Sequence, residues 1–243
     1  MQPEMGSSAE WLERELKVVT YADSLPAYHQ FCRAEKGKYV LGAGTDRYFK
    51  HPVFDLPVVR HRFSGDFSEL TVKTPVHGHG NAVRQEVNLR LEGTADEVEK
   101  LLQLQGYGIA IEISKISHIY YLPHVVLSYY TVMTPAGEPL RVPDMEMVPA
   151  RFIEVELRED LDWTAEYRLF AASHKQAWRC GDRAIPISRG CRHAEDFCYE
   201  VMRGWLTVLS EAGVRFKPVP LEASLWQMFG ERVVLNTPGE TIQ

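Results

Sequence analysis

The chain has 243 residues, of which 45% are hydrophobic and 25% are charged, and its formal net charge is −6. This length suffices for one large domain or for a domain with an appendage, and the proportions are ordinary for a soluble globular protein. The negative charge argues against a general nucleic-acid surface, which needs a basic stripe. No apolar run approaches the roughly 18 residues of a membrane span, and no signal-peptide pattern opens the sequence. The four irregularly spaced cysteines predict free thiols and therefore a cytoplasmic protein.

The first predicted element is a strand with a charged face. Because side chains alternate along a strand, Glu13, Glu15 and Lys17 point to one face. Leu16 and Val18 point to the other face and can be buried. Two carboxylates and an ammonium group in one row can hold a divalent cation beside a phosphate. The alternative is an ordinary solvated strand edge.

Residues 24–52 predict a helix, a short strand, a turn and a second strand. Pro26 is tolerated in the first turn of the helix, which is expected over residues 24–35. The short strand is expected at 38–41, a glycine-rich turn at 42–44 and the second strand at 46–52.

Three further strands with charged faces are predicted at 59–62, 69–73 and 83–91, with a turn at 77–81. Arg60 and Arg62 share a face of the first of them. On a common surface these arginines and Lys73 repel one another unless an anion lies between them. The third strand has a polar residue at every even position, including Glu86.

A helix interrupts the series of strands at 94–105. Thr94 and Glu97 form a capping box at its start, and Gly106 ends it. Strands at 108–121 and 125–133 follow, and then a hairpin with a turn at 134–138 that leads into 140–147. The last predicted strand, 152–157, has Glu154 and Glu156 on one face, and such a pair requires a cation.

Five charged motifs occur in a specific order along residues 10–158: Glu-x-Glu-x-Lys, Arg-x-Arg, Thr-Val-Lys-Thr-Pro, Arg-x-Glu and a final Glu-x-Glu. The ordered set resembles the CYTH superfamily, also called triphosphate tunnel metalloenzymes, which includes thiamine triphosphatases, inorganic triphosphatases and class IV adenylyl cyclases. The resemblance implies an α+β fold, in which a closed eight-stranded antiparallel barrel has a charged interior and flanking helices. We expect a flexible tail at 1–10, the tunnel domain at 11–158 and a mainly helical extension at 159–243, packed on the barrel, with helices at 163–177 and 191–212.

The resemblance also implies the site residues. The expected ligands of Mg²⁺ or Mn²⁺ are Glu13, Glu15, Glu86, Asp144, Glu154 and Glu156. The expected substrate-binding residues are Lys17, Arg60, Arg62, Lys73, Arg84, Arg90 and His118. Catalysis is assigned to Glu13, Glu15, Lys17 and Lys73.

The sequence departs from the family in the strand at 108–121. The family usually has a Lys-x-Arg pair before Tyr121, where Ile116 and His118 stand here. Lys115 is one residue out of phase and is predicted to face away from the tunnel in the absence of a bulge. His118 would then contribute charge to phosphate binding only when protonated.

The function expected from this resemblance is divalent-metal-dependent hydrolysis of the terminal phosphate of a small-molecule triphosphate. That substrate is inorganic triphosphate or an organic one such as thiamine triphosphate. One alternative is a class IV-type adenylyl cyclase that makes cyclic AMP and pyrophosphate from ATP. The other is a non-catalytic module that binds a nucleotide or polyphosphate. No membrane partner is expected, and a homodimer is possible.

Overall fold

The computed structural model describes residues 8–53, 59–65, 67–75, 83–91, 94–142, 148–173, 175–188 and 190–217, together with Leu225, Met228 and Phe229; for 8–11, 75, 83 and 84 it describes only the backbone. Its strands are β1 (Ser8–Val19), β2 (Lys38–Lys50), β3 (Val59–Ser64), β4 (Phe67–Pro75), β5 (Val83–Arg90), β6 (Gly108–Tyr121), β7 (Val125–Met133), β8 (Arg151–Leu157), β9 (Ala177–Cys180) and β10 (Arg183–Pro186). Its helices are α1 (Leu25–Ala34), α2 (Ala95–Leu104), α3 (Trp163–Ser173) and α4 (Ala194–Glu211), and a 3₁₀ turn, Ala22–Ser24, precedes α1.

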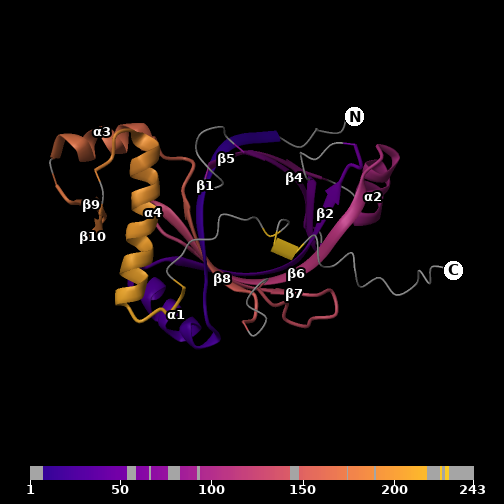
Figure 1. The fold of residues 1–243 in the computed structure, drawn as a ribbon, viewed down its shortest axis with the longest axis horizontal. Coiled ribbons are helices and arrows are strands. Elements are labelled where there is room, and N and C mark those ends of the chain that lie inside the picture. The colour runs from indigo at the N-terminus through magenta and orange to yellow at the C-terminus, as the bar shows by residue number, and fades with distance from the viewer. Residues whose placement is uncertain are drawn as a thin grey trace.

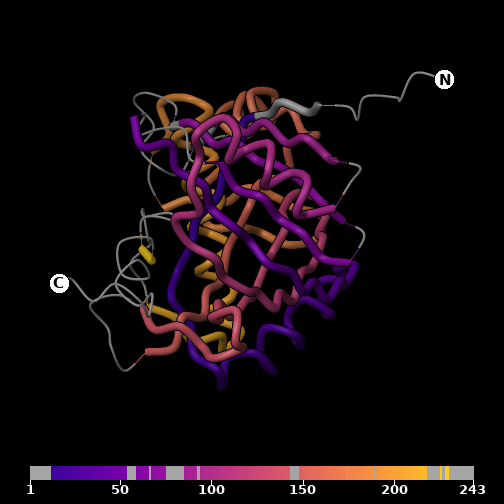
Figure 2. The backbone as a smooth tube through the Cα atoms, turned by 90° about the vertical axis from the view of Figure 1, so that its right-hand side faces the viewer, coloured from indigo at the N-terminus to yellow at the C-terminus, as the bar shows by residue number. Residues whose placement is uncertain are grey.

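Eight antiparallel strands close into a barrel in the order β1-β5-β4-β3-β2-β6-β7-β8. Figure 1 looks into the closed ring that they form. In Figure 2 the strands cross the view obliquely, as the tilt of a closed barrel requires. The predicted eight-stranded antiparallel barrel is therefore confirmed. The predicted capping box is present at the start of α2, where the Thr94 side chain accepts from the Glu97 amide.

Strand register decides which side chains face the interior. In the β1–β8 pair, Glu15 lies opposite Glu156 and Lys17 lies opposite Glu154. Residues directly opposite each other in an antiparallel pair lie on the same face of the sheet. The charged rows of these two strands therefore face the barrel interior together, while Leu16 faces outward.

Apolar side chains fill the interior at one end of the barrel. Val19 lies opposite Phe152 at the end of β1, and both are buried. The cluster that they join also contains Tyr48, Ile111, Ile113, Tyr130, Val132, Val142, Ala150, Leu225 and Phe229. Leu225 and Phe229 come from far along the chain and are buried in this cluster. This end of the barrel is packed, so a cavity can extend only toward the other end.

A second core lies outside the barrel, where α1, α4 and the β9–β10 hairpin pack against the outer faces of β1 and β6–β8. Trp205 of α4 is fully buried in this core. Gly204 lets α4 approach β10 closely, because a Cβ there would lie 2.4 Å from the Pro186 carbonyl oxygen. The helices of residues 163–211 thus share a hydrophobic core with the barrel (Figure 1).

Two predicted boundaries were wrong. Residues 42–44 form no turn, because β2 continues through Gly42 and Gly44 and pairs with β6 over its whole length. A Cβ at Gly44 would lie 3.2 Å from the Phe63 carbonyl oxygen, so the glycine allows close approach of β3. The helix predicted at 163–177 ends at Ser173, and its last residue belongs to β9. The predicted turn at 77–81 lies outside the described residues.

The four cysteines form no disulfide bond among the described residues, which agrees with the predicted thiols. Among the described residues, no helix combines the length and the apolar character that crossing a membrane requires.

Candidate functional site

A cavity of about 570 Å³ lies inside the barrel, and inward-facing residues of all eight strands line it. The described lining residues include eight carboxylates: Glu13, Glu15, Asp46, Glu69, Glu86, Glu154, Glu156 and Glu159. They include five basic side chains: Lys17, Arg60, Arg62, Lys73 and Lys115. Among these residues negative charge therefore exceeds positive charge, although both signs are present.

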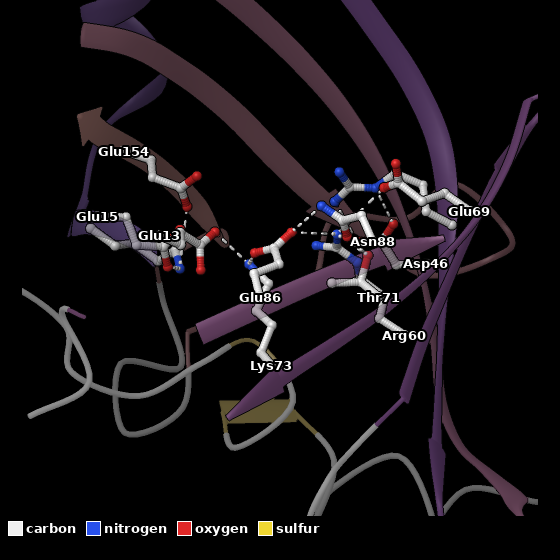
Figure 3. A network of polar contacts seen from close by, with 12 residues as sticks. Glu13, Glu15, Asp46, Arg60, Glu69, Thr71, Lys73, Glu86, Asn88 and Glu154 are labelled. Carbon is white, nitrogen blue, oxygen red and sulfur yellow. Dashed lines mark hydrogen bonds and ion pairs between the residues drawn. The ribbon is translucent and has the colours of Figure 1, made fainter. Parts of the chain in front are cut away.

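Two lysines each contact two carboxylates in the cavity, and Figure 3 shows those of Lys73. Lys73 Nζ lies 2.5 Å from Glu13 Oε1 and 2.8 Å from Glu86 Oε2. Lys17 Nζ lies 3.1 Å from Glu15 Oε1 and 3.3 Å from the carboxylate of Glu154. Each of these two ammonium groups on β1 and β4 thus lies between two carboxylates of β1, β5 or β8.

Arg60 belongs to a polar chain that crosses β3, β4 and β5 (Figure 3). It donates to Thr71 at 2.8 Å, Thr71 donates to Asn88 at 2.6 Å, and Asn88 donates to Glu86 at 2.7 Å. The Nε of Arg60 is buried and has no hydrogen-bond partner among the described residues. This N–H is available to an anionic ligand, because a buried donor left unpaired is costly.

Asp46 forms ion pairs with two cations of the cavity, Arg62 and Lys115. It is almost completely buried and accepts from Arg62 Nε at 2.7 Å and Nη2 at 3.0 Å. Lys115 Nζ contacts the same carboxylate at 2.6 Å. Burial alone would raise the pKa of Asp46, but the two cations hold it well below its usual range. Burial lowers the pKa of Lys115 to about 8, against the favourable effect of Asp46.

Crowded carboxylates indicate a cation site on β1 and β8. Burial raises the pKa of Glu156 well above its ordinary value, and the charges of Glu13, Glu154 and Glu15 raise it further. Among the described residues the Glu156 side chain has no hydrogen bond or salt bridge, and no three potential ligands already converge on a metal position. Carboxylate oxygens are the ligands that Mg²⁺ and Mn²⁺ prefer, so this donor set fits such an ion.

Most of the predicted site residues lie together. The cavity lining contains Glu13, Glu15, Lys17, Arg60, Arg62, Lys73, Glu86, Glu154 and Glu156. Arg90 does not line the cavity; it is exposed, with its guanidinium over the Phe67 ring at 5.6 Å. The backbone of Arg84 pairs with Glu13, but its side chain lies outside the described part of the structure, as does Asp144.

The predicted roles of His118 and Lys115 are corrected by the register of β6. His118 lies on the outer face, where its Nδ1 is 3.0 Å from the Tyr39 hydroxyl and its ring is 4.9 Å from that of His29 in α1. It therefore does not reach the cavity. Lys115 points inward instead. No bulge causes this, because the register shift between β2 and β6 lies at Tyr48, away from Lys115.

With Lys115 inward, Ser117 takes the inward position two residues later, so neither Ile116 nor His118, where the Lys-x-Arg pair was expected, faces the cavity. Asp46, Glu69 and Glu159 were not predicted as cavity residues, although Glu69 shares the polar face of β4 with Thr71 and Lys73. Glu159 follows β8, and burial together with the charges of Glu86 and Glu13 raises its pKa to about 7. Asn88 had a detectable signal, because it is one of the polar even-numbered residues of β5.

The fold and the site together define a closed barrel with paired acidic and basic groups around an internal cavity. The model of the CYTH domain matches residues 40–173, and the chain belongs to the CYTH family. This family includes triphosphatases, and they depend on a divalent metal.

Solved structures with the same fold include the PH1819 protein of Pyrococcus horikoshii OT3. It is 17% identical, with a TM-score of 0.57 over 90% of this chain and 98% of that chain. A conserved hypothetical protein from Pyrococcus furiosus is 20% identical, over 66% of this chain and 88% of that chain, with a TM-score of 0.46. HpAC1 from Hippeastrum, a protein with a dominant triphosphatase activity, is 9% identical, over 71% and 91%, with a TM-score of 0.44. A comparison with curated protein sequences finds no match.

Proposed function

We propose that the protein is a divalent-metal-dependent triphosphatase, which removes the terminal phosphate of a small-molecule triphosphate. The observation that carries the proposal is the arrangement of charge in one enclosed cavity. Carboxylates on β1 and β8 lie beside Lys17 and Lys73, and Arg60 presents an unpaired N–H from β3. An anion-binding site alone needs only the basic groups, whereas hydrolysis of a metal–triphosphate complex uses both sets.

In this proposal the basic side chains bind and orient the triphosphate. Arg60, Lys17 and Lys73 neutralise its oxygens and keep the scissile bond in line with the attacking water. The carboxylates of Glu13, Glu15, Glu154 and Glu156 hold the metal. Glu86 lies 2.8 Å from Lys73 Nζ and partly neutralises the charge of that lysine. A bound Mg²⁺ or Mn²⁺ would supply Lewis-acid polarisation of the phosphate oxygens.

The bond changes are those of a simple hydrolysis. The water oxygen bonds to the terminal phosphorus, the bridging P–O bond breaks, and a diphosphate and orthophosphate are released with the water proton. No covalent intermediate with the protein is required, because positioning and electrostatics account for most catalysis of phosphoryl transfer.

Phosphorus NMR tests the proposal directly. Purified protein would be incubated with tripolyphosphate, thiamine triphosphate and ATP, each with Mg²⁺ or Mn²⁺. We expect orthophosphate release that is lost in Glu154→Gln and kept in Glu138→Gln, whose carboxylate is exposed on a turn away from the cavity. Cyclic AMP with pyrophosphate from ATP would identify a cyclase instead. Binding of a triphosphate without any turnover would identify a binding module, and either result overturns the proposal.

A further inference from the structure

The uncharged part of the cavity wall points to the kind of triphosphate that the protein takes. We propose that β6 and β7 hold a flat heteroaromatic group of the substrate beside Ile119, Tyr121 and Val126, so that the substrate is an organic triphosphate. This inference rests on the proposed function, because it assigns the non-phosphate part of the same substrate.

Charge is unevenly distributed around the cavity. The carboxylates and lysines described above come mainly from β1, β4, β5 and β8. On β6 and β7 beyond Lys115, the described lining residues are uncharged: Ser117, Ile119, Tyr121, Val126, Ser128 and Tyr130. Register makes this a continuous surface, since Ile119 lies opposite Ser128 and Tyr121 lies opposite Val126.

The neighbouring strand leaves room in front of this surface. Gly42 of β2 lies directly opposite Ser117, and a Cβ at Gly42 would meet Ile119 at 3.7 Å and Ser117 at 3.8 Å. Two small residues thus face the cavity where longer side chains would occupy it. The other end of the barrel is filled by the cluster around Val19 and Phe152, so an organic group has its space here.

The size and chemistry of the cavity favour an organic substrate over inorganic triphosphate. A volume of about 570 Å³ lies within the range of about 300–1,000 Å³ typical of sites for whole organic ligands. Inorganic triphosphate is charged and polar over its whole surface, so it cannot cover Ile119, Tyr121 and Val126. An aromatic ring covers such apolar side chains and can stack on the tyrosine.

Polar atoms at the same surface match the edges of a heteroaromatic ring. The hydroxyls of Ser117 and Ser128 line the cavity and make no hydrogen bond to the described residues. A few polar groups within an apolar surface are what usually orients a ligand in its pocket. A purely aliphatic group would leave both hydroxyls unused.

The test compares substrates by their kcat/KM in the intact protein with Mg²⁺ or Mn²⁺. Thiamine triphosphate and ATP are the heteroaromatic probes, and tripolyphosphate is the inorganic one. We expect one of the two organic probes to exceed tripolyphosphate by tenfold or more, and the better probe distinguishes a nucleobase from a thiamine-type ring. Equal or higher kcat/KM for tripolyphosphate would overturn the inference.

Two variants locate the ring. Ser117→Trp is expected to lower the ratio of organic to inorganic kcat/KM by tenfold or more, and Tyr121→Ala by roughly tenfold through lost stacking. Ile116→Trp is the matched control, since it puts the same side chain on the outward, 41% exposed face of the same strand. It should leave both rates unchanged. Tyr121 is 45% exposed, so its truncation tests the site even if Ser117→Trp does not fold. Unchanged ratios in Ser117→Trp and Tyr121→Ala would overturn the inference.

Calorimetric titration with Ca²⁺ in place of the activating metal separates this inference from the proposed function. If no triphosphate is hydrolysed but the organic probe binds at least tenfold more tightly than tripolyphosphate, and Tyr121→Ala abolishes that difference, the ring site stands and the hydrolase proposal fails. Equal binding of the two kinds of probe would contradict the ring site whatever the turnover.

Discussion

The substitution Asp46→Asn tests whether the charge of Asp46 stabilises the fold by compensating the cations Arg62 and Lys115. Asp46 is the common partner of Arg62 and Lys115, at 2.7 Å and 2.6 Å. Asparagine keeps the size of the side chain and one acceptor oxygen, but it removes the negative charge. Two cations would then face each other across a buried position with no counter-charge.

The magnitude follows from how much water each group retains. Removing one partner of a buried ion pair usually costs about 3–5 kcal/mol, because an uncompensated charge remains. The Asp46 side chain is 2% exposed and that of Lys115 is 14% exposed, but that of Arg62 is 35% exposed and keeps part of its hydration. We therefore expect the lower end of the range, a loss of about 3 kcal/mol in the free energy of unfolding.

Urea unfolding at pH 7 measures this loss, and a double-mutant cycle with Lys115→Met identifies its origin. Methionine keeps the apolar stem of the lysine and removes its charge. If the loss arises because the two cations are left without a counter-charge, Asp46→Asn should cost about 1–3 kcal/mol less in the Lys115→Met background than in the wild type. A loss below about 1 kcal/mol, or equal losses in both backgrounds, would refute the reasoning.

Three further predictions concern charge and packing elsewhere. The pKa of Lys115 is about 8 in the folded protein and ordinarily 10.5, so the unfolded chain binds more protons between these two pH values. The free energy of unfolding should therefore rise over that window, by up to about 3 kcal/mol relative to Lys115→Met. Urea unfolding from pH 7.5 to 10.5 measures this rise. Gly204→Ala should cost about 1–3 kcal/mol by overpacking, whereas Gly190→Ala, with open space at its Cβ, should change little; equal thermal shifts would contradict this. Lys73 competes with a metal ion for the Glu13 carboxylate, so Lys73→Met should tighten the binding of Mn²⁺ in the absence of triphosphate by about tenfold. The same variant should weaken the binding of tripolyphosphate. If calorimetry finds an unchanged Mn²⁺ affinity, lysine and metal do not compete.

The sequence allowed prediction of the interior wherever a strand has one polar and one apolar face. In β1 and β8 the alternation of glutamates with Leu16, Ile153 and Val155 fixes which side is inside once the barrel is closed. This is a local property of each strand, because successive side chains point to opposite faces. The charged inner surface of the barrel could therefore be predicted before any strand pairing was known.

The face of β6 could not be predicted in this way, because both of its sides are partly apolar. Ile111 and Ile113 point into the packed end of the barrel, whereas Tyr120 is buried on the outside in the core that contains α1. The alternation then gives no signal, and the position of Lys115 depends on pairing with distant β2. The glycines of β2 were also misleading: neither Gly42 nor Gly44 forms a turn, and Gly44 instead allows the close approach of β3.

The ion pairs of the cavity bear on why a metal and a triphosphate would be needed together. Lys73 and Lys17 already have carboxylate partners, so their charges are compensated within the protein. A triphosphate that binds alone must draw these lysines away and leave buried glutamates without a counter-charge. That is unfavourable, because burial already raises the pKa of Glu156. A divalent cation that binds alone must share those glutamates with the lysines. When both bind, the phosphates take over the lysines and the cation takes over the carboxylates, so no buried charge is left unpaired. Mutual dependence of the two ligands thus follows from the ion pairing of this chain, independently of any part that the metal has in bond cleavage.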